Sequence, residues 1–312
     1  MNQYMPEGML ITSDKNYEYT SNLEGLERAM RSNVILEGIA TLCDHNFNLH
    51  INLPANIRAI IPRTEAGYFP DGSSAKDIAI LTRVGKPVSF KVIGFEKNEL
   101  GERTVILSRK AAQKECVENY TDSLTPGDII PAKVTHLENF GAFVDIGCGI
   151  ISLLSIDTIS VSRISHPSAR VNVNDFIYTV VKSKDEKGRI FVSERELLGN
   201  WEENAALYKE GETVRGIIRS VESYGVFVEL RPNLAGLAEY RSDVRVGQTA
   251  AVYIKSIIPE KMKIKLIIIN SEDAPAYAQP LEYFIDTSVY SHIDRWRYSP
   301  YSSSKVIESV FE

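Results

Sequence analysis

Hydrophobic residues in this chain alternate with polar ones over short runs. Each run extends for about five to eight residues and ends near Gly, Asn, Asp or Pro, which is typical of β-strands. In one such run Ala142, Val144 and Ile146 fall on one apolar face, because successive strand side chains point to opposite sides. Residues 109–120 and 194–209 are instead rich in Glu, Ala and Leu, and they predict short helical connectors.

The strand pattern repeats within the chain. A shift of 84 residues aligns residues 126–146 with residues 210–230, so that Phe140 meets Tyr224 and Phe143 meets Phe227. The upstream copy then has an extra loop, and the match resumes at an offset of 73. Glycines, aromatics and polar spacing agree together, which indicates two copies of one structural unit.

A third, more degenerate copy lies further upstream, with Phe47 and His50 at the positions of the two aromatics and a polar insertion at residues 64–76. Units of roughly 65–80 residues with about five strands favour the OB architecture. We therefore predict an all-β protein of three tandem five-stranded OB-fold barrels, joined by short helical connectors and followed by an aromatic C-terminal tail. The predicted divisions are an N-terminal extension (1–32), a degenerate barrel (33–113), a connector (114–123), a middle barrel (124–197), a second connector (198–208), a last barrel (209–270) and the tail (271–312).

The repeated aromatics are candidates for binding. Phe143 shares a strand face with Asp145, and Phe227 with Glu229, opposite to the apolar residues, which predicts that this face points to solvent. The other aromatic of each pair precedes a glycine, where a bulge can turn it to the same face. Outward aromatics near basic residues provide a stacking platform for unpaired bases. The alternative is that one ring of each pair only covers the end of its barrel.

Two strings carry a family resemblance. Residues 139–145 (NFGAFVD) and 223–229 (SYGVFVE) resemble the signature strand of the ribosomal protein S1 RNA-binding domain. Residues 188–193 and 105–108 resemble the closing strand of that domain. Two copies match well, and the first copy matches only in its second half.

The resemblance implies a binding site for single-stranded RNA on one barrel face, made of two aromatics, an acidic and a basic residue and often a histidine. By position, the implied RNA-binding residues are Phe140, Phe143, Asp185 and Arg189 in the middle copy and Tyr224, Phe227 and Lys263 in the last copy. The histidine position departs from the family pattern. It is Ser155 or Ser152 in the middle copy and Glu239 in the last, where a carboxylate would repel phosphate. His166, in the extra loop, is expected to be a structural hydrogen-bonding residue.

Charge adds two further candidates. Lys182 and Lys255 recur at matched positions and alternate outward, and this repetition makes them better RNA candidates than scattered lysines. For each lysine taken singly, a solvated strand face is the favoured alternative. The formal net charge of −6 argues against a polyanionic partner at first sight. The three barrel segments, however, carry 28 basic and 24 acidic side chains, and the rest of the chain 7 and 17. This predicts modest RNA affinity with more stacking than phosphate contact, and a shallow salt dependence.

The sequence offers no catalytic constellation. The five histidines have no zinc-ligand spacing, the three cysteines lie far apart, and no GxSxG, P-loop or GxGxxG motif occurs. No apolar run approaches the ~18 residues of a membrane span, and no secretory signal is evident at the N-terminus. We predict a cytoplasmic, non-catalytic protein without a cofactor.

The combined prediction is a protein that binds single-stranded RNA or mRNA and acts in translation, with the small ribosomal subunit as a candidate partner and no membrane association. The alternative is a protein-interaction scaffold that docks on the ribosome or an RNA-processing complex and has reduced RNA binding, which Glu239 and the degenerate first copy favour. The aromatic tail is expected to fold back on the last barrel. Its run from Arg295 to Tyr298 could instead stack on bases.

Overall fold

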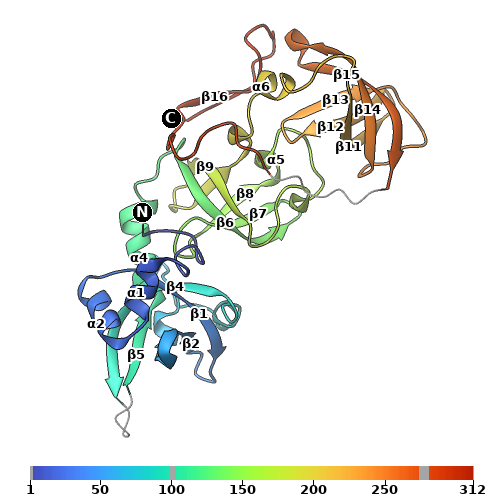
Figure 1. The fold of residues 1–312 in the computed structure, drawn as a ribbon. Helices are drawn as coiled ribbons and strands as arrows, with labels where there is room; N and C mark the ends of the chain where they lie inside the picture. Colours follow the sequence, from blue (N-terminus) through green and yellow to red (C-terminus); the bar gives the residue numbers. More distant parts are fainter. Residues whose placement is uncertain (1–2, 98–102, 274–280, 312) are drawn as a thin grey trace. The chain divides into compact units, whose positions relative to one another are not determined.

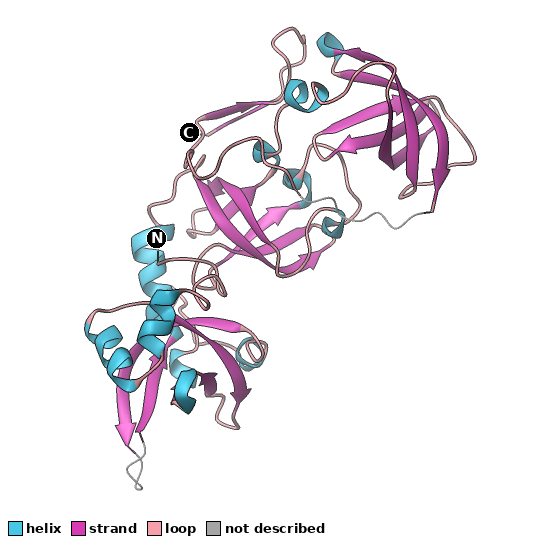
Figure 2. Cartoon of the chain, viewed as in Figure 1, coloured by secondary structure: helices cyan, strands magenta, loops and turns pink. Residues whose placement is uncertain are grey.

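The structure is a computed structural model that describes residues 3–97, 103–273 and 281–311. It contains three closed barrels of five strands each (Figure 1). Strands make up most of its regular structure (Figure 2). The predicted all-β fold of three tandem OB-type barrels is therefore confirmed, including the degenerate first copy.

All three barrels have one strand order, in which the third strand pairs in parallel with the fifth. The first barrel consists of β1 (Leu36–Cys43), β2 (Leu49–Asn52), β3 (Arg58–Ile61), β4 (Pro87–Lys97) and β5 (Arg103–Ser108). The middle barrel consists of β6 (Ile129–Glu138), β7 (Gly141–Asp145), β8 (Ile151–Ser155), β9 (Phe176–Lys184) and β10 (Ile190–Ser193). The last barrel consists of β11 (Thr213–Glu222), β12 (Gly225–Arg231), β13 (Leu234–Ala238), β14 (Thr249–Ile258) and β15 (Lys263–Glu272).

The helices are short and lie mainly outside the barrels. They are α1 (Asp14–Thr20), α2 (Leu23–Arg31), α3 (Asp77–Leu81), α4 (Arg109–Cys116), α5 (Ile156–Ile159) and α6 (Trp201–Ala205). A π-helical turn (Val117–Thr121) follows α4, and 3₁₀ turns occur at Pro54–Asn56, Arg63–Glu65, Pro167–Ala169, Arg195–Leu197 and Pro259–Lys261. The predicted connectors become α4, which the Ser108 hydroxyl caps, and α6, which begins with a capping box of Asn200 and Glu203.

The chain divides into two compact units with separate cores. The first unit comprises Met1–Leu124, Pro131–Lys133 and Asp145–Ile151, and the second comprises Thr125–Ile130, Val134–Val144 and Ser152–Glu312. In the first unit, Leu26 and Ala29 of α2 pack with Phe90 and Leu107 of the first barrel. The N-terminal extension is thus part of that core, which the sequence analysis did not predict.

The tail belongs to the core of the second unit. Trp296, in β16 (Arg295–Arg297), and Tyr298 are buried with Trp201 of α6 and the apolar residues of the last barrel. The hydroxyl of Tyr298 donates a hydrogen bond to the Asn233 carbonyl oxygen at 2.8 Å. A short strand, β17 (Glu308–Val310), pairs with β16. The tail folds back on the last barrel, as predicted.

Candidate nucleic-acid interface

One row of side chains crosses the outside of each barrel, and we call it the outer row. In the last barrel, the register of the five strands places these residues side by side: Ser220, Phe227, Leu237, Lys265 and Ser256. Directly paired residues of neighbouring strands point to the same side of a sheet. Val226 and Val228, which flank Phe227, are fully buried in the core. The outer row therefore faces away from the core.

The other two barrels repeat this row. In the middle barrel the pairing of β8, β10 and β9 places Leu153, Phe191 and Ser183 in it, and the repeat offset adds His136 and Phe143. In the first barrel the row consists of Leu42, His50, Ile60, Ile106 and Gly94. His50 thus occupies the position of Phe143, as the sequence analysis predicted.

An aromatic pair with nearly the same geometry lies on the middle and last barrels. The ring centroids of Phe140 and Phe143 are 6.0 Å apart with the rings at 90°, and those of Tyr224 and Phe227 are 6.1 Å apart at 86°. Phe140 is 54% exposed and Tyr224 is 68% exposed. The edge-to-face contact holds the two rings of each pair while leaving aromatic surface open for stacking.

A glycine between the two aromatics makes this arrangement possible. A Cβ on Gly225 would lie 2.6 Å from the Ala238 carbonyl oxygen and 2.8 Å from the Leu237 Cδ1 atom. Gly141 approaches the backbone of Leu154 in the same way. Only a residue without a side chain allows the second and third strands to approach so closely at this point.

The middle barrel has a larger aromatic surface than the last. The His136 ring stacks on Phe143, with centroids 6.3 Å apart and the rings at 22°, and it bonds to Glu138 at 2.8 Å. Phe191 adds a third half-buried ring to the row. Neither ring is predicted from the sequence pattern. The repeat offset would have revealed His136, because it aligns with Ser220, the strand partner of Phe227.

The predicted lysines lie at equivalent strand irregularities. Lys182 and Lys255 are each the extra residue of a β-bulge, and both are exposed. A bulge re-aims its side chain, which explains why the two lysines recur. Lys263 is exposed on β15, and Lys265, which was not predicted, lies in the outer row itself. The first barrel has Ile93 at the bulge.

Asp185 and Arg189 close the turn between β9 and β10. The Asp185 carboxylate accepts the backbone N–H groups of Lys187 (3.0 Å) and Arg189 (2.8 Å) and the Nε–H of Arg189 (2.7 Å). These bonds, the backbone bond from Arg189 first, lower the pKa of Asp185. The Arg189 side chain remains 69% exposed. Asp185 thus orients an exposed cation, and RNA contact by either residue stays a prediction.

The expectation that Asp145 faces solvent is wrong. Asp145 is 1% exposed, and it accepts the backbone N–H of Glu7 at 2.7 Å and those of the glycine turn that follows its own strand. Burial, followed by the charge of Glu7, raises the pKa of Asp145 to about 7. A segment more than a hundred residues away in sequence covers this end of the strand, so alternation alone could not predict its exposure.

Glu229 is buried as well, against the same expectation. It is 4% exposed and accepts two hydrogen bonds of 2.9 Å from Arg219 and a third from Arg170. Arg170 comes from the extra loop of the middle barrel, whose backbone also bonds to Asn233. The loop therefore fastens the middle and last barrels together within the second unit.

The family's histidine position remains without a histidine. Ser152 is buried and donates to the Ile190 carbonyl oxygen at 2.7 Å, Ser155 is half-buried, and Glu239 is exposed. His166 accepts the Ser168 N–H at 3.1 Å, so it caps a turn, as expected for a structural residue. Across the described parts of the chain, no group of three or more His, Cys, Asp or Glu side chains is placed to hold a metal ion. None of the helices in those parts is long and apolar enough to cross a membrane.

Comparison with known proteins agrees with this geometry. Residues 123–195, which include the whole middle barrel, match the S1 RNA binding domain family. The chain is 29% identical to small ribosomal subunit protein bS1 of Pseudomonas aeruginosa, over 80% of this chain and 46% of the relative. It is also 29% identical to the bS1 homolog of Bacillus subtilis, over 70% of this chain and 59% of the relative. The chain thus spans about half the length of these relatives.

Among solved structures, a multidomain protein with nucleic acid binding domains from Streptococcus pneumoniae aligns at 15% identity and a TM-score of 0.24, over 76% of this chain and 73% of that one. An overlap this low does not inform the function. The family match, the bS1 relatives and the three equivalent barrels agree with one another. The chain is an S1-like protein with S1 domains.

Proposed function

We propose that this chain binds single-stranded RNA across the outer rows of its middle and last barrels, and that it acts in translation without catalysing a reaction. The observation that carries the proposal is the aromatic pair, which recurs at right angles in both barrels, together with a bulged lysine on the fourth strand of each barrel. Exposed rings stack on unpaired bases, and flanking cations contact the backbone.

The middle barrel is the principal site in this proposal. Its outer row supplies three aromatic rings, and Lys182 and Arg189 supply exposed cations. The last barrel has Ser220 in place of the stacked histidine and exposes Glu239. We expect the last barrel to bind RNA more weakly than the middle barrel. It still raises the affinity of the whole chain, because RNA held by one barrel is at a high effective concentration for the other.

The partner we propose beyond RNA is the small ribosomal subunit, because the relatives are themselves proteins of that subunit. For the same reason we propose a cytoplasmic location. A second candidate function is a protein-interaction scaffold with reduced RNA binding. The mostly aliphatic outer row of the first barrel favours it, since Leu42 is 54% exposed and Ile106 stands where the other two barrels have Phe191 and Lys265.

A titration separates the two functions. Single-stranded RNA, duplex RNA and single-stranded DNA of equal length are compared at low and high salt. We expect single-stranded RNA to bind and duplex RNA not to, because paired bases cannot stack on the rings. The five candidate cations of the middle and last barrels should contribute no more than about −4 to the slope of log K against log salt. Failure of all three nucleic acids to bind at low salt would favour the scaffold.

A further inference from the structure

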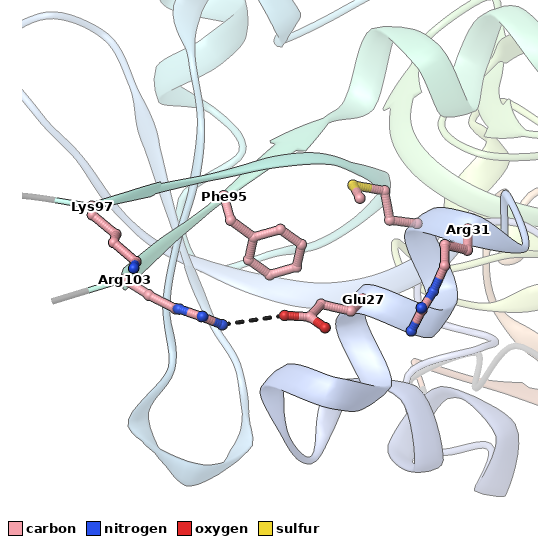
Figure 3. A pocket seen from close by; sticks show the side chains of 6 residues that line it. Glu27, Arg31, Phe95, Lys97 and Arg103 are labelled. Carbon is pink, nitrogen blue, oxygen red and sulfur yellow. Dashed lines mark hydrogen bonds and ion pairs between the residues drawn. The ribbon is translucent and has the colours of Figure 1, made fainter. Parts of the chain in front are cut away.

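The first barrel has a basic pocket, and none of the residues that line it belongs to the outer row. The pocket has a volume of about 390 Å³ and lies between α2 and the hairpin of β4 and β5 (Figure 3). It is lined by Glu27, Met30, Arg31, Phe95, Lys97 and Arg103. This volume lies within the range of small-molecule sites, about 300–1,000 Å³.

Two elements of the first unit build the pocket. The helix α2 is capped by Asn22 and buries Leu26 and Ala29 in the core, which leaves its last turn, with Met30 and Arg31, at the surface. Lys97 and Arg103 are direct partners across the β4–β5 hairpin. The hairpin and the helix therefore bring three cations to one opening.

Phe95 forms the apolar wall of this opening. It is paired with Val105, which is fully buried, so its ring points toward the inside of the barrel. At the barrel end the ring is only half-buried, and Figure 3 shows it between the hairpin cations and α2. A partly open ring at a barrel end is available to a second planar group.

The charges of the pocket are not balanced. Arg103 pairs with Glu27 at 3.2 Å, and this is the ion pair drawn in Figure 3. Arg31 and Lys97 are exposed and have no ion pair with any residue that the structure describes. Three cations against one carboxylate leave the pocket with a charge of +2 beside an apolar wall. A ligand that satisfies both features is flat, apolar on its faces and anionic.

We propose that this pocket binds a nucleotide of single-stranded RNA, with the base against Phe95 and Met30 and the phosphates on Arg31, Lys97 and Arg103. The pocket gives the first barrel the RNA contact that its aliphatic outer row lacks. A run of acidic residues would pair with the cations but leave the apolar wall uncovered. The inference rests on the proposed function of the chain, because it assigns a further contact to the same RNA.

Paired charge reversals in the full chain test the phosphate contacts. Arg31→Glu with Lys97→Glu changes the pocket, and Lys76→Glu with Lys86→Glu makes the same change of charge at two exposed lysines of the first barrel outside it. Binding to an unstructured RNA of about 30 nucleotides should weaken about 10-fold or more in the pocket variant and less than about 3-fold in the control. Equal losses in both variants, or no loss in the pocket variant, would overturn the proposal.

The ring is tested by Phe95→Leu, which keeps an apolar side chain against the core. We expect a loss of about 5-fold or more from this change, with thermal unfolding confirming that the barrel is folded. Parent-like binding of Phe95→Leu would show that the pocket recognises phosphate alone, and this would overturn the nucleotide assignment. Phe143→Ala with Phe227→Ala, assayed alongside, reports on the proposed function separately. If that variant binds RNA like the parent while the pocket variants bind it more weakly, the result contradicts RNA binding by the outer rows and supports RNA binding by the pocket.

Discussion

Replacing Phe143 by alanine should weaken RNA binding more than replacing Phe227. Stacking of one base on an aromatic side chain contributes about 1–3 kcal/mol, which corresponds to about 5- to 150-fold in affinity. Phe143 also orients two exposed rings, with Phe140 edge-on at 6.0 Å and His136 stacked at 6.3 Å. Phe227 contacts Tyr224 alone among the described aromatic residues. We therefore expect about 30-fold for Phe143→Ala and about 5-fold for Phe227→Ala.

The assay is fluorescence anisotropy with a labelled, unstructured RNA. Tyr253→Ala is the matched control, because Tyr253 is an exposed aromatic of the last barrel that lies outside the outer row. It should bind RNA like the parent. Thermal unfolding of each variant checks that the half-buried rings are not needed for folding. Parent-like binding by both Phe143→Ala and Phe227→Ala would refute stacking, and a larger loss for Phe227→Ala would refute the ranking of the barrels.

Three further substitutions test the framework of the second unit. Glu229→Gln should lower the free energy of unfolding by about 3–5 kcal/mol in a denaturant titration, because it leaves the buried Arg170 and the half-buried Arg219 without their carboxylate; an unchanged midpoint would contradict this. Burial raises the pKa of Glu194 to about 8, so the folded state holds a proton that the unfolded state releases, and stability should fall as pH rises from the ordinary carboxyl range through about 8. Glu194→Gln should reduce the fall in melting temperature between about pH 5.5 and about pH 8.5, and an unaltered fall would exclude Glu194 as its source. Gly225→Ala should destabilise the last barrel and weaken RNA binding, because the added Cβ would lie too close to the Ala238 carbonyl oxygen. A melting temperature equal to that of the parent would contradict this, since it would mean that β13 can shift to accommodate the Cβ.

Most features of the fold that can be predicted from the sequence follow from the internal repeat. Matching Phe140 with Tyr224 and His50 with Phe143 aligned the second strands of the three barrels from the sequence alone, and the strand pairings agree. Alternation within a strand then separated core residues from outer ones, because strand side chains have a strict period of two.

Alternation could not show which outer positions stay exposed. Asp145 and Glu229 have the outward phase that was predicted, yet the N-terminal segment and the extra loop cover them. Both contacts join residues that are distant in sequence, and nothing local to either strand indicates them. The pocket around Phe95 was missed for the same reason, because it needs α2 and the β4–β5 hairpin together.

The site residues that the sequence pattern did not predict can be identified only from the register between paired strands. His136 and Lys265 each lie opposite a neighbour in the outer row, a relation that depends on cross-strand pairing rather than on spacing along one strand. A comparison of all five strands across the repeats, and not of the signature strand alone, would have predicted them.

The most direct test of the central claim is photo-cross-linking of the full chain to a uridine-rich single-stranded RNA, with the modified residues identified by mass spectrometry. We predict that uridine adducts map to Phe140 and Phe143 first, and then to Tyr224 and Phe227, because these rings carry the exposed stacking surface. Adducts confined to other surfaces, with none on these four aromatics, would contradict the account.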